Sequence, residues 1–142
     1  MKPRGPILLL VEDDDNDVFF FRRALEKAGL DVAWHLASDG EQALQYLSGN
    51  GKFADRTAYP LPNLIFLDLK LPYLNGLEIL EYMQKQPALA EIDVIVLTSS
   101  SEERDRKRAF ELGAKKYLVK PATPRTLLEI LGTSRLREEA RL

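Results

Sequence analysis

Several short apolar segments of this sequence are each followed at once by a side chain that could bind a metal ion or a phosphoryl group. The side chains in these positions are Glu12, Asp13, Asp14, Asp68, Thr98 and Lys120. Carboxylates held close together raise each other's pKa unless a cation neutralises them, and Mg²⁺ prefers oxygen ligands of this kind. A lysine ammonium and a threonine hydroxyl can hold phosphoryl oxygens. The pattern therefore indicates phosphoryl transfer, which depends mainly on positioning and charge neutralisation.

The elements that must position these side chains follow from the alternation of apolar runs and helical patterns. Continuous apolar runs of this length are typical of strands buried on both faces of a parallel sheet. The predicted strands are Ile7–Val11, Val32–Trp34, Leu64–Leu67, Val94–Leu97 and Tyr117–Val119. The predicted helices cover about 18–28, 41–48, 77–84 and 102–112, and a fifth begins near Pro124. Five strands alternating with five helices predict an α/β fold with a doubly wound parallel sheet, which binds its ligands at the carboxyl ends of the strands.

Some polar residues have a structural interpretation beside the chemical one. Asp15, Asn16 and Asp17 are interpreted as caps of the first helix, whereas Asp14 either adjusts the site or faces water. Ser99 to Ser101 are expected to cap the fourth helix. His35, the one histidine, is expected to serve packing or to face solvent, because catalytic and metal-binding histidines normally have companions.

The totals of the sequence limit the classes of function. A chain of 142 residues fits one domain, with a core over about 6–132 and a charged tail or helix extension at 133–142. A net charge of −2 disfavours nucleic acid as a partner, and the absence of cysteine favours a cytoplasmic location. The apolar runs are too short to span a membrane, so membrane and export roles are not expected.

Four motifs, in this order, resemble the receiver domain of two-component response regulators. The motifs are Val11-Glu12-Asp13-Asp14, Leu67-Asp68-Leu69-Lys70-Leu71-Pro72 with Asn75-Gly76, Leu97-Thr98-Ser99, and Tyr117-Leu118-Val119-Lys120-Pro121. The likeness covers nearly the whole chain, and it implies a flavodoxin-like receiver fold. It also implies a switch that catalyses its own phosphoryl transfer from the phosphohistidine of a sensor histidine kinase, rather than an enzyme acting on a separate substrate.

The resemblance assigns roles to individual positions. Asp68 resembles the phosphoacceptor, and Asp13 resembles the principal ligand of one Mg²⁺ ion, with Glu12 as its acidic neighbour. Lys70 would lend its backbone carbonyl to the same ion.

The remaining motif positions resemble the residues that respond to the phosphoryl group. Thr98 would move to hydrogen-bond it, Tyr117 would swing from an exposed to a buried position, and Lys120 would hold a phosphoryl oxygen. Pro121 would follow Lys120 in a cis peptide, and Ser99 would support the site together with Asp14.

A turn-rich segment from Gly49 to Pro62 is longer than in most receivers. In this it resembles the small response regulators that partner phytochrome-type kinases, which implies such a kinase as the partner. One helix and a charged tail follow Lys120, so no output domain is expected and the signal would pass through protein contacts. Extra apolar residues in the last helix leave two alternatives: core packing alone, or an exposed strip for a homodimer through the fourth helix, fifth strand and fifth helix.

Three other functions compete with a phosphorylated switch. A phosphatase of the haloacid-dehalogenase type also uses a nucleophilic aspartate with Mg²⁺. That family has an Asp-x-Asp motif at the nucleophile, and here Lys70 stands in place of the second aspartate. A flavodoxin-like electron carrier would need a first loop that cradles phosphate, and the acids at 12–14 would repel it. A degenerate receiver that only binds partners is disfavoured because Asp13, Asp68, Thr98 and Lys120 occur together.

Overall fold

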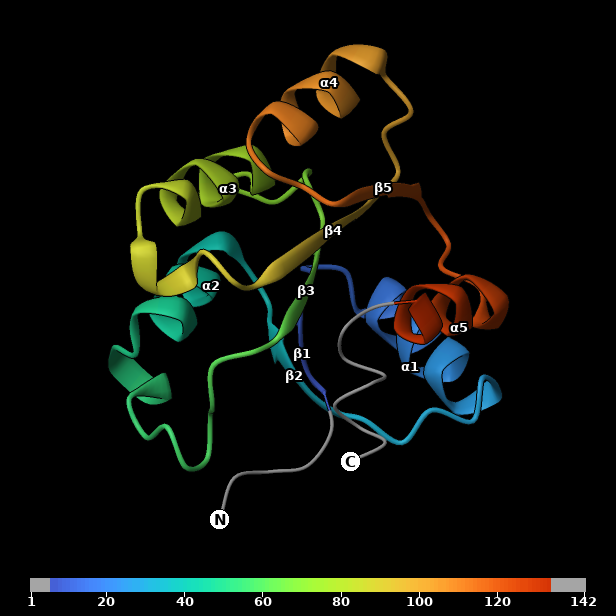
Figure 1. Cartoon of the computed structure of the whole chain (residues 1–142), viewed down its shortest axis with the longest axis horizontal. Helices are drawn as coiled ribbons and strands as arrows, with labels where there is room; N and C mark the ends of the chain where they lie inside the picture. The colour runs from blue at the N-terminus through green and yellow to red at the C-terminus, as the bar shows by residue number, and fades with distance from the viewer. Residues whose placement is uncertain (1–5, 134–142) are drawn as a thin grey trace.

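Five parallel strands form one sheet, with helices on both faces, in the computed structural model, which describes residues 6–133 (Figure 1). The strands are β1 Ile7–Val11, β2 Ala33–Ala37, β3 Leu64–Leu67, β4 Asp93–Thr98 and β5 Lys116–Val119, in the spatial order β2-β1-β3-β4-β5. The α-helices are α1 Asp15–Lys27, α2 Gly40–Ser48, α3 Gly76–Gln84, α4 Glu103–Glu111 and α5 Pro124–Thr133. The predicted fold class is confirmed.

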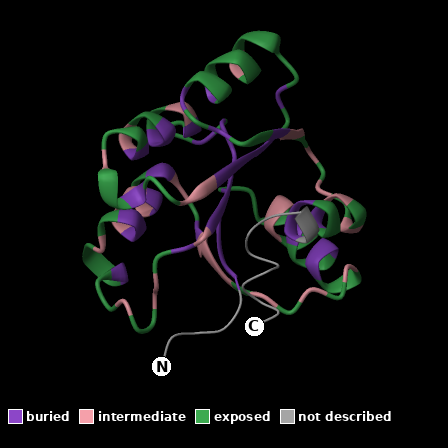
Figure 2. Ribbon diagram, in the orientation of Figure 1, coloured by how far each residue is buried: buried purple, intermediate pink, exposed green. Residues whose placement is uncertain are grey.

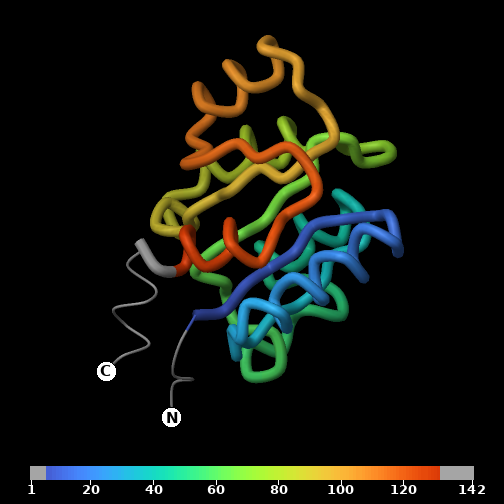
Figure 3. The backbone as a smooth tube through the Cα atoms, turned by 90° about the vertical axis from the view of Figure 1, so that its right-hand side faces the viewer, coloured from blue at the N-terminus to red at the C-terminus, as the bar shows by residue number. Residues whose placement is uncertain are grey.

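The central strands are buried along most of their length (Figure 2). Their side chains alternate between two apolar cores, one on each face of the sheet. Leu8 and Leu10 of β1 face the core shared with α1 and α5, whereas Leu9 and Val11 face the core shared with α2, α3 and α4. Helices α1 and α5 pack against each other on their face, as the blue and red helices of Figure 3 show. Burial on both faces explains why these strands are continuous apolar runs.

The N-terminal caps differ from those expected. Asp14, rather than the acids at 15–17, caps α1, because its carboxylate accepts the backbone N–H groups of Asn16 at 2.8 Å and of Asp17 at 3.1 Å. The N-cap residue of α4 is Glu102, which makes no capping bond through its side chain. The prediction that Ser99 to Ser101 cap this helix is therefore wrong, because the N-cap position lies one residue beyond the three serines.

The turn-rich segment after α2 is held to the domain by one arginine. The Arg56 guanidinium donates to the backbone oxygens of Tyr46 at 2.7 Å, Leu47 at 3.1 Å and Tyr59 at 3.1 Å. Phe53, in a short 3₁₀ helix at Gly51–Phe53, is buried against the rings of Tyr46 and Tyr59. The segment is thus an ordered cap over the end of α2 that adds Phe53 to the core shared with α2, α3 and α4.

Two further expectations concern packing. His35 lies half-buried between the rings of Tyr46 and Tyr59, as expected for a packing residue. In α5, Leu127, Ile130 and Leu131 are buried and Leu128 is exposed, so most of the apolar residues serve the core. The predicted tail beyond residue 133 lies outside the described residues.

Candidate functional site

The candidate site lies where the strand order reverses, at the carboxyl ends of β1 and β3. The chain leaves β1 toward one face of the sheet and β3 toward the other, so the segments after these two strands diverge and leave a crevice between them. Glu12 and Asp13 follow β1, and Asp68 follows β3. Each of these three offers a carboxylate oxygen, and the three oxygens lie within 4.8 Å of one another. The structure thus brings together the three acids that the sequence analysis singled out.

Lys120, which follows β5, reaches this group of acids and contacts three carboxylates. Its ammonium nitrogen lies 2.6 Å from Glu12 Oε1, 2.7 Å from Asp17 Oδ2 and 2.8 Å from Asp68 Oδ2. The Lys120 side chain is 14% exposed, so these contacts form in a largely dehydrated place. The peptide bond between Lys120 and Pro121 is cis, as the resemblance implied.

Burial and the neighbouring charges shift the pKa values of two groups in the cluster, Glu12 and Lys120. Burial raises the pKa of Glu12 from 4.5 to about 7, with the charge of Asp68 adding to the effect and the hydrogen bond from Lys120 opposing it. The pKa of Lys120 is raised: burial opposes its charge, but hydrogen bonds to Asp17, Asp68 and Glu12 outweigh the burial. Lys120 is therefore a permanent cation, whereas Glu12 can take up a proton near neutral pH.

The donor set fits a hard divalent cation. Mg²⁺ is usually bound by one or two carboxylates and several waters, and Asp13 is exposed, which leaves room for water ligands. The backbone N–H of Lys70 donates to Asp68 Oδ1 at 3.1 Å, which fixes the direction of the Asp68 carboxylate. The predicted use of the Lys70 carbonyl as a ligand stays a prediction.

A second polar group, at the end of β4, includes two more of the predicted residues. Thr98 is fully buried, and its hydroxyl oxygen accepts the backbone N–H of Ser100 at 3.4 Å. Tyr117 is buried, and its hydroxyl donates to the backbone oxygen of Ser100 at 2.9 Å. Of the exposed and the buried position that the resemblance implies for Tyr117, this structure has the buried one. Ser99 is exposed beside this group.

Sequence reasoning missed two residues of these groups. Asp17 was interpreted as a helix cap, but its carboxylate pairs with Lys120. Ser100 joins the second group to α4, because its hydroxyl donates to Asp105 Oδ2 at 2.7 Å. Asp17 carried no clear signal, because an acid in the first turn of a helix is already explained by its favourable interaction with the helix N-terminus. Ser100 carried none, since a run of three serines before a helix predicts capping.

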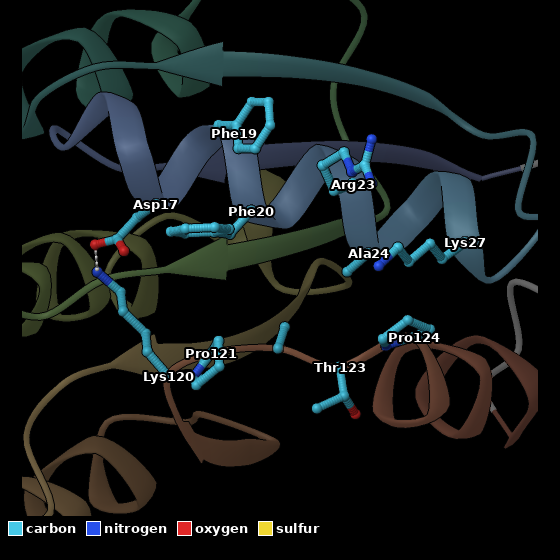
Figure 4. Close-up of a pocket in the computed structure, with 11 residues that line it drawn as sticks. Asp17, Phe19, Phe20, Arg23, Ala24, Lys27, Lys120, Pro121, Thr123 and Pro124 are labelled. Carbon is cyan, nitrogen blue, oxygen red and sulfur yellow. Dashed lines mark hydrogen bonds and ion pairs between the residues drawn. The ribbon is translucent and has the colours of Figure 1, made fainter.

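A groove of about 760 Å³ opens beside the acidic cluster, between α1 and the segment that joins β5 to α5 (Figure 4). Phe19 and Phe20 of α1 are 46% and 56% exposed at this groove. Asp17 and Lys120, joined by their ion pair, stand together at one end of it, as Figure 4 shows. The groove thus gives an apolar surface next to the charged site. No helix among residues 6–133 is long and apolar enough to cross a membrane.

The sheet order and the acidic crevice at its reversal point define the chain as a flavodoxin-like α/β protein with a charged site at the carboxyl edge. The model of the response regulator receiver domain matches residues 8–132, and the chain belongs to this family. This membership argues against a phosphatase of the haloacid-dehalogenase type and against a flavodoxin-like electron carrier.

The proteins that this chain resembles include other response regulators, one of them a bacteriophytochrome response regulator. It is 34% identical to the response regulator Rcp1 of Synechocystis sp., over 88% of this chain and 83% of that protein. Its fold superposes on the bacteriophytochrome response regulator AtBRR with a TM-score of 0.79 and 38% identity, covering 92% of both chains. For the Mn²⁺-bound form of Rcp1 the TM-score is 0.76 and the identity 32%, over 92% of this chain and 94% of that one.

Proposed function

We propose that this protein is a phosphorylated switch, in which Asp68 accepts a phosphoryl group from the phosphohistidine of a sensor histidine kinase. The observation that supports this most is the contact of Lys120 with Asp68 Oδ2 at 2.8 Å, within the group of carboxylates at the reversal point. An oxygen of Asp68 forms the bond to phosphorus while the bond between phosphorus and the histidine nitrogen breaks. The electron pair of that bond stays on the imidazole nitrogen, so the histidine of the kinase is regenerated.

The residues around Asp68 have complementary tasks in this reaction. Glu12, Asp13 and Asp68 would hold one Mg²⁺ ion, together with the Lys70 carbonyl, and the ion would neutralise charge on the phosphoryl oxygens. Lys120 holds the Asp68 carboxylate in place and donates to a phosphoryl oxygen after transfer. The Mn²⁺-bound structure of Rcp1 supports a divalent cation in relatives, and the preference for magnesium is part of the proposal.

The switch itself uses the group at the end of β4. Thr98 donates its hydroxyl to the phosphoryl group, and Tyr117 holds the inward position through its bond to Ser100. Since phosphorylation favours the state in which both contacts exist, it shifts a pre-existing equilibrium. Asp14, Ser99 and Pro121 support the loops that carry these residues.

The partners follow from the surfaces beside the site and from the relatives. A histidine kinase of the bacteriophytochrome type is the proposed donor, supported by the likeness to AtBRR. Its phosphohistidine would approach Asp68 across the groove at Phe20, whose exposed ring offers an apolar contact.

The signal passes on by protein contact in the cytoplasm, with residues 6–132 acting as one receiver domain. A homodimer through α4, β5 and α5 is supported by three exposed apolar side chains on these elements. They are Phe110, Val119 and Leu128, which are 40%, 49% and 47% exposed.

Incubation with Mg²⁺ and phosphoramidate, followed by intact mass measurement, tests the proposal. We expect a gain of one phosphoryl group that a chelator prevents and that Asp68→Asn abolishes without loss of the fold. Asp93→Asn is the matched control, because Asp93 begins β4 at the opposite edge of the sheet. Incorporation at the wild-type level in Asp68→Asn would refute the assignment of the phosphoacceptor.

A further inference from the structure

The ammonium group of Lys120 has no hydrogen left for a new partner. It carries three hydrogens, and the three carboxylate oxygens of Glu12, Asp17 and Asp68 lie at 2.6, 2.7 and 2.8 Å from its nitrogen. A phosphoryl group on Asp68 brings additional anionic oxygens to the same place. Lys120 can donate to one of them only if it gives up a bond that it makes now.

The three carboxylates differ in how easily they can be released. The side chain of Glu12 is 3% exposed, so releasing it would leave a buried charge without its cation. Phosphorylation removes the carboxylate charge of Asp68, whose side chain is 5% exposed, so Lys120 can pass that one hydrogen bond to a phosphoryl oxygen. Lys120 can bond a second phosphoryl oxygen only by releasing Glu12 or Asp17. Asp68 is also tied to the backbone N–H of Lys70. The Asp17 side chain is 35% exposed, and water can replace Lys120 as its partner. Asp17 is therefore the carboxylate that Lys120 can release at the lowest cost.

Asp17 stands apart in origin as well as in exposure. It belongs to the first turn of α1 and lies at the groove, whereas Glu12 and Asp68 directly follow strands β1 and β3 and lie inside the crevice. Figure 4 shows the ion pair of Asp17 with Lys120 bridging the groove between α1 and the segment after β5. Asp17 is not needed to cap the helix, because Asp14 does so.

We propose that Asp17 is a positioning residue that holds Lys120 in the unphosphorylated protein and competes with the phosphoryl group for it. This rests on the proposed function, since it requires an anionic group on Asp68. Asp17 aims the ammonium at Asp68 before transfer and weakens the hold on the phosphoryl group afterwards. Its removal therefore strengthens the binding of a phosphoryl group or of a phosphoryl analogue.

The test is a titration of the purified protein with beryllium fluoride in the presence of Mg²⁺, followed by calorimetry. Asp17→Asn keeps the size of the side chain and removes its charge, and we expect it to bind beryllofluoride roughly two- to five-fold more tightly than the wild type, the range for one partly exposed ion pair. Asp15→Asn is the matched control: Asp15 is an exposed acid in the same turn and is not one of the carboxylates at Lys120. Asp17→Glu, which restores the carboxylate, should return the affinity toward that of the wild type.

The direction of the change separates this role from a structural one, because damage to the site would weaken binding. Urea unfolding of each variant verifies that the fold is kept. Equal or weaker binding by Asp17→Asn, or an equal gain in Asp15→Asn, would overturn the competition. Failure of the wild type itself to bind the analogue would refute the proposed function, and the inference with it.

Discussion

Replacing Glu12 by glutamine should change how the stability of the metal-free protein depends on pH. Glu12 is 2% exposed, and its pKa in the folded protein is about 7 against an ordinary value of 4.5. The folded state therefore holds a proton on this carboxyl at pH values where the unfolded state has lost it. Stability from this group is fully present below about pH 4.5 and is lost as the pH rises through about 7.

The magnitude follows from the same pair of pKa values. Since one pKa unit corresponds to about 1.4 kcal/mol, the wild type should lose about 3 kcal/mol of unfolding free energy relative to Glu12→Gln between about pH 4.5 and pH 7. Burial lowers the pKa of His35, which gives a slope of the opposite sign as the pH rises through its ordinary value of 6.5. Because both proteins contain His35, its contribution cancels in the difference between them.

Urea unfolding of both proteins in chelator, at intervals from about pH 4.5 to pH 8, measures this difference. Saturating Mg²⁺ should reduce the slope of the wild type, because an ion held by Glu12 and Asp13 favours the ionised carboxylate and replaces its proton. A wild-type curve that runs parallel to that of Glu12→Gln throughout this range would refute the reasoning.

Two substitutions outside the cluster test the backbone that carries it. Arg56→Met should lower the unfolding free energy by about 2 to 4 kcal/mol, because the three carbonyl oxygens that Arg56 bonds lose a charged donor. Lys52→Met, an exposed neighbour, should change it by less than about 0.5 kcal/mol, and an equal effect of the two would contradict the role of Arg56. Gly76→Ala places a Cβ against the backbone oxygen of Asp68, where backbone atoms leave no room for it. It should therefore cost more than Gly29→Ala, where the strain of a φ of +70° costs only about 1 to 2 kcal/mol. Urea unfolding measures the loss of unfolding free energy in both variants. A smaller loss in Gly76→Ala than in Gly29→Ala would show that the backbone at Asp68 has room for a Cβ on residue 76.

The sequence predicted the buried parts of the fold better than the edge. Strands β1 and β3 match their predicted bounds because burial on both faces makes them continuous apolar runs. At the edge, β2 extends three residues beyond its predicted end at Trp34 and contains His35, because an edge strand is only half-buried and carries a weaker apolar signal. The arginine anchor of the segment at 49–62 could not be predicted, since a guanidinium bound to backbone oxygens has no sequence pattern.

The acids that follow strands could be assigned from sequence, whereas the acid on a helix could not. Glu12 and Asp68 are placed by the sheet, whose parallel strands bring their carboxyl ends to one edge whatever the loops do. The pairing of Asp17 with Lys120 depends instead on how the end of β5 lies beside the first turn of α1, where the two side chains meet at one end of the groove. That crossing depends on the packing of α1 against α5, which is a tertiary contact.

The number of charges explains why the cluster needs a partner. Glu12, Asp13, Asp17 and Asp68 face one ammonium, that of Lys120, so three negative charges remain uncompensated when all four acids are ionised. The protein can relieve this repulsion by a proton on Glu12 or by a divalent cation. A phosphoryl group would add negative charge to the same place. A divalent cation could bind its oxygens, whereas a proton on Glu12 could not. In the proposed function, the same excess of charge that disfavours the ionised metal-free state would make acceptance of a phosphoryl group depend on the cation, and release of Asp17 from Lys120 would favour it.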